Sequence, residues 1–410
     1  MIKRILYTLL IMFPVVASAQ INTDRVMAIG RNALYFEDYV LSIQYFNQVI
    51  NAKPYLSDPY FYRGLAKINL DDFQGAESDC SEAIERNPFV VSAYQVRGLA
   101  RIQQNNFAGA IEDYTKALEF APENIGVWHN MALCRIRQED YKGAKNDLDK
   151  LIAISPRYTK AYLMRGEVDL KQKDTLAAEK DFGKAIEIDR YDADTWASRA
   201  ILRLQQQRYK DAEADFDHAI RLSTRNSGVY INRALARYHQ NNLRGAMSDY
   251  DIALDIDPNN FIGHYNRGLL RAQVGDDNRA IQDFNFVIEM EPDNMMAIFN
   301  RGLLLDQTGD YKGAIKDYST VINEYPNFLL GYQYRAQARR KIGDVKGADA
   351  DEFKVLKAQL DKQNGVDPNK QTADNTENNK TRKKSDKNMN NYRKIVVADN
   401  EEGEEKYKSD

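Results

Sequence analysis

The sequence predicts an all-α solenoid, in which tandem helix-turn-helix repeats stack on one another and a disordered, charged tail follows. The first observation is a period of 34 residues, since Met295–Phe328 repeats the pattern of Phe261–Asn294. The second is that seven of the ten prolines are separated by multiples of 34, namely Pro54, Pro88, Pro122, Pro156, Pro258, Pro292 and Pro326. Because one hairpin cannot bury its apolar face alone, a fixed period of this kind indicates copies that stack on their neighbours.

Each copy is predicted to contain two helices joined by a tight turn. In the copy that begins at Met295, Gly302 lets the helices approach closely, Gln307–Asp310 forms the turn, and Pro326 ends the second helix. A small residue keeps one register in the second helix, as Ser42, Ala76, Ala110, Ala144, Ala178, Ala212, Ala246, Ala280, Ala314 and Ala348. Ten copies therefore tile residues 23–362 without an insertion. They predict one elongated domain, although such a length would ordinarily suggest about two or three globular ones.

The copies at the two ends depart from the pattern, as expected where one face meets water instead of a neighbour. The first copy has Ser42 in place of alanine. The last has Glu352 where earlier copies place Cys80, Tyr114, Leu148, Phe182, Phe216, Tyr250, Phe284 and Tyr318. The last helix is therefore predicted to close the stack. Copies five and six have Arg190 and Thr224 in place of the proline, which fits either a softer joint or an ordinary turn.

Residues 1–19 have the parts of a secretory signal peptide. Lys3 and Arg4 precede an apolar run from Ile5 to Val16, and the segment ends in the small residues ASA. The run is short for a membrane span, so an uncleaved anchor is the less favoured alternative. We therefore expect an exported, periplasmic protein that has no membrane span after cleavage. Its mature chain would begin at Gln20, which is not the cysteine that a lipoprotein requires.

Charge and cysteine content narrow the classes of partner and of covalent structure. The net charge is -3, so neither a nucleic acid nor an acidic membrane surface is an expected partner. The two cysteines, Cys80 and Cys134, fall at different registers two repeats apart. Helices that stack about 8–10 Å apart would hold them beyond the reach of a disulfide. Both are predicted to be buried and unpaired.

After Lys362 the period ends, and residues 363–410 are rich in Asn, Lys, Asp, Glu and Thr. Such a segment cannot bury enough apolar surface to offset its ordering entropy, so we expect disorder, above all in Gln363–Asn391. The tail contains one short β-prone run, residues 392–397 with the sequence YRKIVV. This run is either incidental or a strand that pairs with the sheet edge of a partner.

The repeat resembles the tetratricopeptide repeat, or TPR. The resemblance rests on the 34-residue spacing, on Gly or Ala at the eighth position, Ala at the twentieth, an aromatic residue at the twenty-fourth and Pro at the thirty-second. An aromatic residue also recurs at the fourth position, as Tyr60, Tyr94, Trp128, Tyr162, Trp196, Tyr230 and Tyr332. The ten copies extend over 340 of the 410 residues.

The resemblance implies a right-handed superhelix whose first helices line a concave groove. Members of the family mostly hold a peptide or another protein in that groove, and few catalyse a reaction without an appended domain. We recognise no catalytic domain in this sequence and expect no enzyme, no catalytic residue and no cofactor. Because one fold hosts many functions, the repeat predicts the architecture and leaves the partner open.

Asparagine recurs at the sixth position, which the family's geometry faces towards the groove, as Asn130, Asn232, Asn266 and Asn300. Tyr238, Tyr265 and Phe299 lie on the same first helices. An amide is both donor and acceptor, so a row of amides at regular spacing can bind an extended peptide backbone without reading its sequence. The row is similar to the asparagine ladder of the O-linked N-acetylglucosamine transferase superhelix. These seven residues form the predicted peptide-binding groove; the alternative is that the asparagines are solvated.

Arginine recurs at the seventh position and aspartate at the twenty-third. Within copies seven to nine the pairs are Arg233 with Asp249, Arg267 with Asp283, and Arg301 with Asp317. We predict a structural ladder of ion pairs beside the packed seam, because the guanidinium fork can bind one carboxylate twice. An anion-binding row is disfavoured, since each aspartate would already occupy its arginine.

The sequence shows no recognisable metal or nucleotide site. The four histidines, His129, His218, His239 and His264, have no metal-ligand spacing and no cysteine companions. No Gly-rich phosphate loop or nucleophile elbow is present. The Lys and Asn pattern with which chaperone-binding relatives hold a C-terminal carboxylate is also absent, so that mode of recognition is disfavoured.

The first functional hypothesis is therefore an exported, non-enzymatic TPR adaptor that binds an extended peptide or a partner protein in its groove, principally in copies seven to nine. One alternative is a structural spacer of an envelope or secretion assembly, attached through its tail. Another is an auxiliary part of a longer protein whose effector domain lies beyond residue 410. Loss of peptide binding on replacing Asn266 and Asn300 with alanine would separate an adaptor from a spacer.

Overall fold

The computed structural model describes residues 22–222, 225–364, 389, 392–395 and 398 of the chain. The predicted signal peptide and most of Gln363–Asn391 lie outside these residues. Within them every extended regular element is an α-helix and no strand is present, as the all-α prediction requires. No helix of the described part is both long and apolar enough to cross a membrane.

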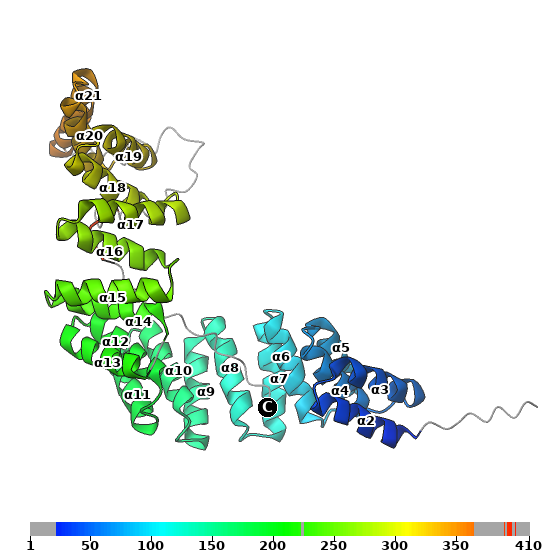
Figure 1. Cartoon of the computed structure of the whole chain (residues 1–410). Coiled ribbons are helices and arrows are strands. Elements are labelled where there is room, and N and C mark those ends of the chain that lie inside the picture. The colour runs from blue at the N-terminus through cyan, green and yellow to red at the C-terminus, as the bar shows by residue number, and fades with distance from the viewer. Residues whose placement is uncertain (1–21, 223–224, 365–388, 390–391, 396–397, 399–410) are drawn as a thin grey trace, which may run out of the picture. The chain divides into compact units, whose positions relative to one another are not determined.

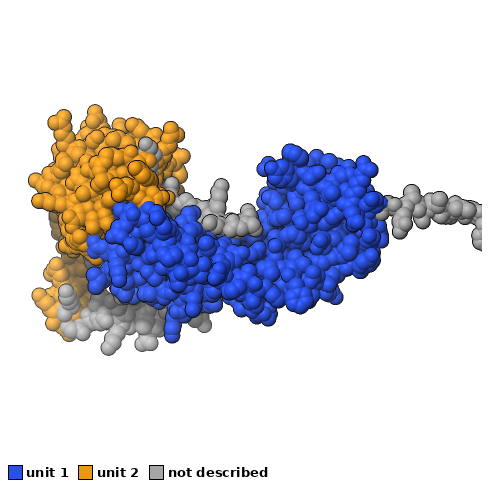
Figure 2. Space-filling view, turned by 90° about the horizontal axis from the view of Figure 1, so that it is seen from below, with its two compact units in different colours: residues 1–188, 404–410 blue, residues 189–403 orange. Residues whose placement is uncertain are grey.

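The chain divides into two compact units, one of residues 1–188 with 404–410 and one of residues 189–403 (Figure 2). The boundary falls at Asp189, next to the position where copy five has Arg190 in place of the helix-ending proline. The sequence predicted one domain; the structure has two units, which contain the helices of copies one to five and of copies six to ten. We call them unit 1 and unit 2 and describe each by itself.

Consecutive helices pack against one another within each unit (Figure 1). Unit 1 contains α2 (Thr23–Tyr35), α3 (Tyr39–Ala52), α4 (Asp58–Ile68), α5 (Phe73–Arg86), α6 (Val91–Gln103), α7 (Phe107–Phe120), α8 (Ile125–Arg137), α9 (Tyr141–Ile154), α10 (Thr159–Lys171) and α11 (Thr175–Ile188). Unit 2 contains α12 (Ala193–Gln205), α13 (Tyr209–Arg221), α14 (Ser227–His239), α15 (Leu243–Ile256), α16 (Phe261–Gln273), α17 (Asp277–Met290), α18 (Met295–Thr308), α19 (Tyr311–Glu324), α20 (Leu329–Lys341) and α21 (Val345–Gln363). Each copy is thus one helical hairpin.

The second helices begin and end where the sequence supplies a cap and a stop. Before α19, the side chain of Asp310 accepts a hydrogen bond from the backbone N–H of Gly313 and satisfies one of the free donors of the first turn. The helix ends at Glu324, two residues before Pro326. Because proline lacks a backbone N–H and its ring clashes with the preceding turn, it cannot continue the helix.

The turn inside each copy contains one residue in the left-handed conformation, always at the fifteenth position. Seven of these residues are not glycine, namely Glu37, Asp71, Asn105, Glu139, Lys173, Gln207 and Asn241, and three are Gly275, Gly309 and Gly343. A residue with a Cβ adopts this conformation at a cost of roughly 1–2 kcal/mol. Glycine and several different polar residues occupy this position, so no single residue type marks it in the sequence.

The seam of each hairpin is built as predicted. Ala314 and Tyr318 face the first helix from α19 and have no exposed surface. A Cβ added to Gly302 would lie 3.0 Å from the Tyr318 ring, so the helices approach closely at this glycine. Cys80 and Cys134 are buried, free thiols, which confirms their prediction. At the end of the stack Glu352 is exposed and accepts hydrogen bonds from Arg340.

Candidate functional site

Three of the predicted groove asparagines lie at matching places in unit 2. Asn232 is on α14, Asn266 on α16 and Asn300 on α18, and their exposed fractions are 0%, 0% and 5%. They are therefore not solvated, and a buried amide requires hydrogen-bond partners. Asn130 is buried on α8 in unit 1 and so lines a different groove. Each unit is therefore described with its own asparagines.

The groove of unit 2 holds a segment of the chain's own tail. We call the described residues Met389, Tyr392–Ile395 and Ala398 the tail segment. Asn232 donates from Nδ2 to the carbonyl of Ala398 at 2.9 Å, and its Oδ1 accepts the backbone N–H of the same residue at 2.9 Å. One side-chain amide thus satisfies both backbone groups of one tail residue.

A second set of contacts holds Tyr392. Its carbonyl accepts a hydrogen bond from the Tyr265 hydroxyl at 2.8 Å and another from Asn300 Nδ2. The Tyr392 ring meets the Phe299 ring edge to face, with the ring centroids 4.8 Å apart. Burial raises the pKa of Tyr265, so its hydroxyl stays a donor at neutral pH. Tyr265, Phe299 and Asn300 were all predicted groove residues, and here they meet one tyrosine.

Apolar contacts complete the seat of the tail segment. Met389 belongs to the buried cluster that includes Phe299, Phe328 and Ala338. Ile395 is 9% exposed in a cluster with Leu204 and Leu235, against which Tyr238 and Leu269 pack. Ala398 is 3% exposed, in a cluster with Ile231, Ala234 and Tyr250. Arg393 and Lys394, between the buried residues, are exposed.

Two hollows remain beside Ile395. One has a volume of about 440 Å³ and is lined by Leu269, Phe284, Leu303 and other residues of α16 to α18. The other has a volume of about 410 Å³ and is lined by Leu204, Leu235 and other residues of α12 to α14. Tyr238 borders both hollows, and its hydroxyl donates to Gln273 at 2.8 Å. The tail segment therefore does not fill the groove.

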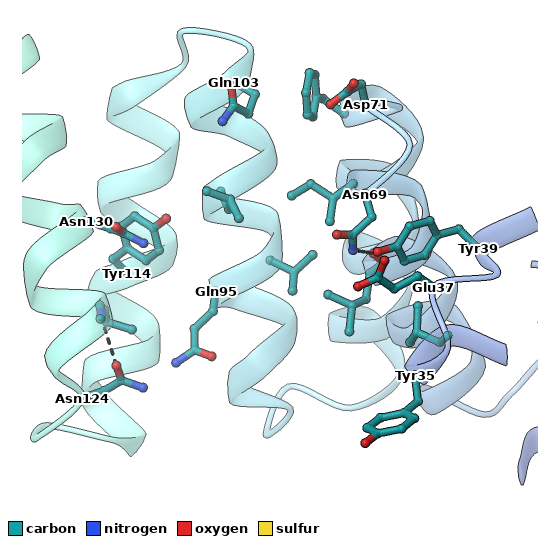
Figure 3. Close-up of a pocket in the computed structure, with 18 residues that line it drawn as sticks. Tyr35, Glu37, Tyr39, Asn69, Asp71, Gln95, Gln103, Tyr114, Asn124 and Asn130 are labelled. Atoms are coloured by element: carbon teal, nitrogen blue, oxygen red, sulfur yellow. Dashed lines mark hydrogen bonds between the residues drawn. The ribbon is translucent and has the colours of Figure 1, made fainter. Parts of the chain in front are cut away.

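Unit 1 has a groove of its own with a volume of about 530 Å³ (Figure 3). Asn130 lines it together with Gln95 and Gln103 of α6 and Asn69 after α4. Glu37 and Asp71 also line this groove, and Tyr35 and Tyr39 lie near Glu37 (Figure 3). The lining is thus amide-rich and acidic, unlike the largely apolar seat of the tail segment in unit 2.

The run Tyr392–Val397 was predicted to be either incidental or a strand added to a partner's sheet. Its described residues, Tyr392–Ile395, form no strand and instead lie in the groove of the same chain. In this chain the four described residues therefore contact the groove, and pairing with a partner's sheet stays a prediction. The reason is tertiary: the groove offers amide and phenol partners, so the segment needs no sheet edge to satisfy its backbone.

The predicted arginine and aspartate residues of copies seven to nine form close pairs. Arg233 Nη2 lies 2.6 Å from Asp249 Oδ1, and the distance is 2.7 Å both from Arg267 to Asp283 and from Arg301 to Asp317. The sequence analysis missed a second arginine, at the eleventh position, that binds the same carboxylate. Arg237 binds Asp249 at 2.8 Å and Arg271 binds Asp283 at 2.7 Å, whereas copy nine has Leu305 at this position. The recurrence of arginine at that position was the signal that could have revealed it.

The described residues include potential metal-ligating side chains, among them the four histidines. No group of three or more His, Cys, Asp and Glu side chains in the described ranges is arranged to hold a metal ion. His264 donates from Nε2 to the carbonyl of Pro258 at 3.0 Å, and its Nδ1 lies 3.0 Å from Asp283 Oδ1. The ring also stacks on Phe286, so this histidine is part of the packed seam. Another of the four histidines, His239, stacks on Tyr209 and lines a hollow beside the tail segment.

Comparison with family models follows the repeat copy by copy. Models described as tetratricopeptide repeat match residues 91–124, 125–158, 159–192, 198–261 and 265–327. These matches cover most of copies three to nine. A search of the curated proteins finds no match to this chain.

Comparison with solved structures finds similar helical repeats. A tetratricopeptide repeat protein from Parabacteroides merdae is 21% identical, with a TM-score of 0.47, over 61% of this chain and 98% of that one. PilF from Pseudomonas aeruginosa is 20% identical, with a TM-score of 0.43, over 49% of this chain and 92% of that one. YrrB, described as a TPR protein with an unusual peptide-binding site, is 18% identical, with a TM-score of 0.41, over 45% of this chain and 95% of that one.

Proposed function

Because the chain belongs to the tetratricopeptide repeat family, whose members are in general non-catalytic interaction adaptors or scaffolds, we propose that it is an adaptor whose unit 2 groove binds an extended peptide segment of a partner. The observation that carries the proposal is the two-way pairing of Asn232 with the backbone of Ala398. A groove that holds one peptide segment in this way has the chemistry to hold another.

The backbone contacts support recognition of a main chain in extended form. Asn232 and Asn300 both bind backbone groups of the tail segment, and the Tyr265 hydroxyl does the same. Backbone N–H and C=O groups occur in every peptide, and each must be paired when it is buried. The amides therefore supply affinity for any segment of suitable conformation.

The spacing of these contacts also fits an extended chain. Ala398 pairs with copy seven and Tyr392 with copy nine, so six residues span two copies. At about 3.3 Å per residue, six extended residues reach about 20 Å. Packed helices lie about 8–10 Å apart. If equivalent helices of neighbouring copies are about 10 Å apart, two copies also span about 20 Å. The repeat and an extended peptide thus stay in register.

A binding measurement on the full chain tests this proposal. The tail-released variant carries Tyr392→Ala and Ile395→Asp, which remove two buried side chains of the tail segment. A fluorescent peptide of residues 387–400 is expected to bind this variant. Adding Asn300→Ala should weaken binding about fivefold, because one net hydrogen bond contributes roughly 1 kcal/mol and 1.4 kcal/mol is tenfold in affinity. The matched control is Asn259→Ala, since Asn259 is exposed in the loop before α16.

An unchanged affinity in both the Asn300→Ala and the Asn232→Ala backgrounds would refute binding in this groove. Thermal unfolding of each variant, followed by circular dichroism, checks that the helices remain folded. A peptide that binds the released variant but loses nothing with either substitution binds elsewhere, and the groove of unit 1 is then the next surface to test.

Export is the second part of the proposal, and its support is the pattern of residues 1–19. In a bacterial host the expressed chain is expected in the periplasmic fraction. Amino-terminal sequencing of that material should begin at Gln20. A chain that stays in the cytoplasm with Met1 intact would show that residues 1–19 are not a cleaved signal.

A further inference from the structure

Four described residues of the tail segment pack in the groove and lie three positions apart in the sequence, namely Met389, Tyr392, Ile395 and Ala398. Met389 is 3% exposed, Ile395 9% and Ala398 3%, and Tyr392 is half-buried against Phe299. Arg393 and Lys394, which separate two of them, are exposed. A β-strand would bury every second residue. Here the N–H of Tyr392 donates to the carbonyl of Met389 at 3.3 Å, so the segment begins in a tight turn, and a 3₁₀ turn returns the same face every third residue.

The period of three equals the number of tail residues per copy. Tyr392 and Ala398 are six residues apart and bind asparagines two copies apart. Met389 packs in a cluster of copies nine and ten, Ile395 in one of copies six and seven, and Ala398 in one of copies seven and eight, so each of these side chains has a site of its own. Those sites differ in their contents: aromatic rings surround Tyr392, leucines surround Ile395, and alanines and Ile231 lie about Ala398.

Resting on the proposed function, we infer that the groove of unit 2 selects segments with apolar side chains three residues apart, in the order large, aromatic, aliphatic, small. The chain's own tail is an intramolecular copy of that motif. A partner that carries the motif must displace the tail segment before it binds. The backbone contacts give affinity for any peptide sequence. The three-residue spacing of apolar side chains gives the sequence specificity.

The hollows beside Ile395 fit an occupant that can be displaced. Volumes of about 440 and 410 Å³ next to this side chain mean that the tail segment leaves apolar surface of the groove uncovered. A partner with a larger side chain at this place gains burial that the tail cannot supply. A partner can therefore compete with the tail segment for the groove.

A register experiment on full-length protein tests the inference. The probe is a fluorescent peptide of residues 387–400, and the protein is the tail-released variant defined above. In the shifted peptide one glycine is inserted between residues 393 and 394. The matched control carries the same extra glycine after residue 400, so that the two peptides have one composition and one length.

The shifted peptide is expected to bind at least about tenfold more weakly than the control, because a one-residue slip moves half of the apolar side chains away from their sites. The wild-type chain should bind the control peptide at least about tenfold more weakly than the released variant. If the tail segment leaves the groove free in about one molecule in ten, the apparent affinity for the peptide falls about tenfold.

Equal affinity of the shifted and control peptides would overturn the inference and leave the proposed function standing, since the backbone contacts alone would then suffice. Failure of both peptides to bind, together with no effect of Asn300→Ala, would instead count against the proposed function. Equal affinity of wild-type and released chains would show that the tail does not compete. A wild-type dimer that Ile395→Asp dissociates, measured by light scattering, would assign the tail segment to a neighbouring copy and overturn its intramolecular role.

Discussion

The side chain of Asn232 and the backbone of Ala398 form a reciprocal pair, although the two residues are 166 positions apart in the sequence. Both hydrogen bonds measure 2.9 Å, and Asn232 has no exposed surface. The pair resembles the contact between neighbouring strands of a sheet, with a side-chain amide in the place of one strand. It fixes the position of Ala398 in the groove.

The Ala398 site predicts a size limit. Ala398→Leu should release the tail segment, because added methyl groups in this closely packed cluster cost about 1–3 kcal/mol. The measurement is the rate of tryptic cleavage after Arg393 and Lys394, with cleavage at Lys383 and Lys384 as the internal reference. Ala398→Gly keeps the backbone pair and is the matched control. Equal cleavage rates in the two variants would mean that no size limit operates.

The hollows beside Ile395 predict the opposite effect of added volume. A peptide of residues 387–400 with Ile395→Phe should bind the tail-released variant about two- to tenfold more tightly than the unchanged peptide, because the ring covers apolar surface that isoleucine leaves open. Fluorescence anisotropy measures both affinities. The control is the same change at Lys394, an exposed position. Weaker binding of the phenylalanine peptide would show that the hollows do not accept the ring.

The sequence predicted the repeat, the seam and the close pairs of the ladder because each depends on residues that recur within 34 positions. Gly302, Ala314 and Tyr318 belong to one copy, and so do Arg301 and Asp317, so their contacts follow from local helix geometry. The groove asparagines of unit 2 were chosen from the same recurrence, and their role in binding a partner stays a prediction. Asn130 was grouped with them because residue type and register do not report the boundary between units.

The tail segment could not be predicted from the sequence. Its composition is polar on average. An average over the whole tail does not show that four apolar residues lie three positions apart. Its partners, Asn232, Tyr265 and Asn300, are more than ninety positions away. Only the assembled groove brings them together.

The ion-pair ladder predicts unequal costs for two similar substitutions. Arg301→Met leaves Asp317 without an ion-pair partner among the described residues, whereas after Arg267→Met Asp283 still pairs with Arg271 and His264. Removing one partner of a buried pair costs about 3–5 kcal/mol when the other charge is left uncompensated. We therefore expect Arg301→Met to destabilise its copy by about 3 kcal/mol and Arg267→Met by about 1 kcal/mol.

Hydrogen exchange of α18 and α19 compared with α16 and α17 measures this difference locally. A local measurement is needed because long repeat arrays do not unfold in one step. Equal loss of protection in the two variants would mean that the second arginine does not compensate for the first.

The left-handed turn predicts that replacing two glycines with alanine changes the stability in opposite directions, although both glycines have open surroundings. A Cβ on Gly309 or on Gly183 would meet nothing within 4 Å, but Gly309 has a φ of 91° and Gly183 lies inside α11. Gly309→Ala should therefore destabilise by about 1–2 kcal/mol. Gly183→Ala should stabilise by about 0.5–1 kcal/mol, because alanine is the better helix former. Hydrogen exchange at the two sites checks the signs, and a loss at both would point to steric causes.

The last prediction concerns Asp147, the one ladder aspartate whose copy has a methionine, Met131, at the seventh position. Its side chain is 8% exposed and has Arg135 as its ion partner at 2.8 Å. Burial raises the pKa of Asp147 to about 6, and Arg135 only partly opposes this. The unfolded value is near 3.9. Between these values the folded chain binds a proton that the unfolded chain does not, so this group's stabilising effect is present below pH 4 and is lost as pH rises through 6.

Met131→Arg supplies the missing partner and should lower the pKa of Asp147, because an opposite charge within hydrogen-bonding distance favours the carboxylate. Its effect on the thermal midpoint should therefore be more favourable at pH 7.5 than at pH 5, by an amount equivalent to about 1–2 kcal/mol once solvent screening is allowed for. The loss of methionine packing is the same at both pH values and cancels in that difference. Nuclear magnetic resonance titration of the Asp147 carboxyl gives the pKa directly. If Met131→Arg shifts the midpoint equally at the two pH values, the missing arginine is not what leaves this carboxylate poorly compensated.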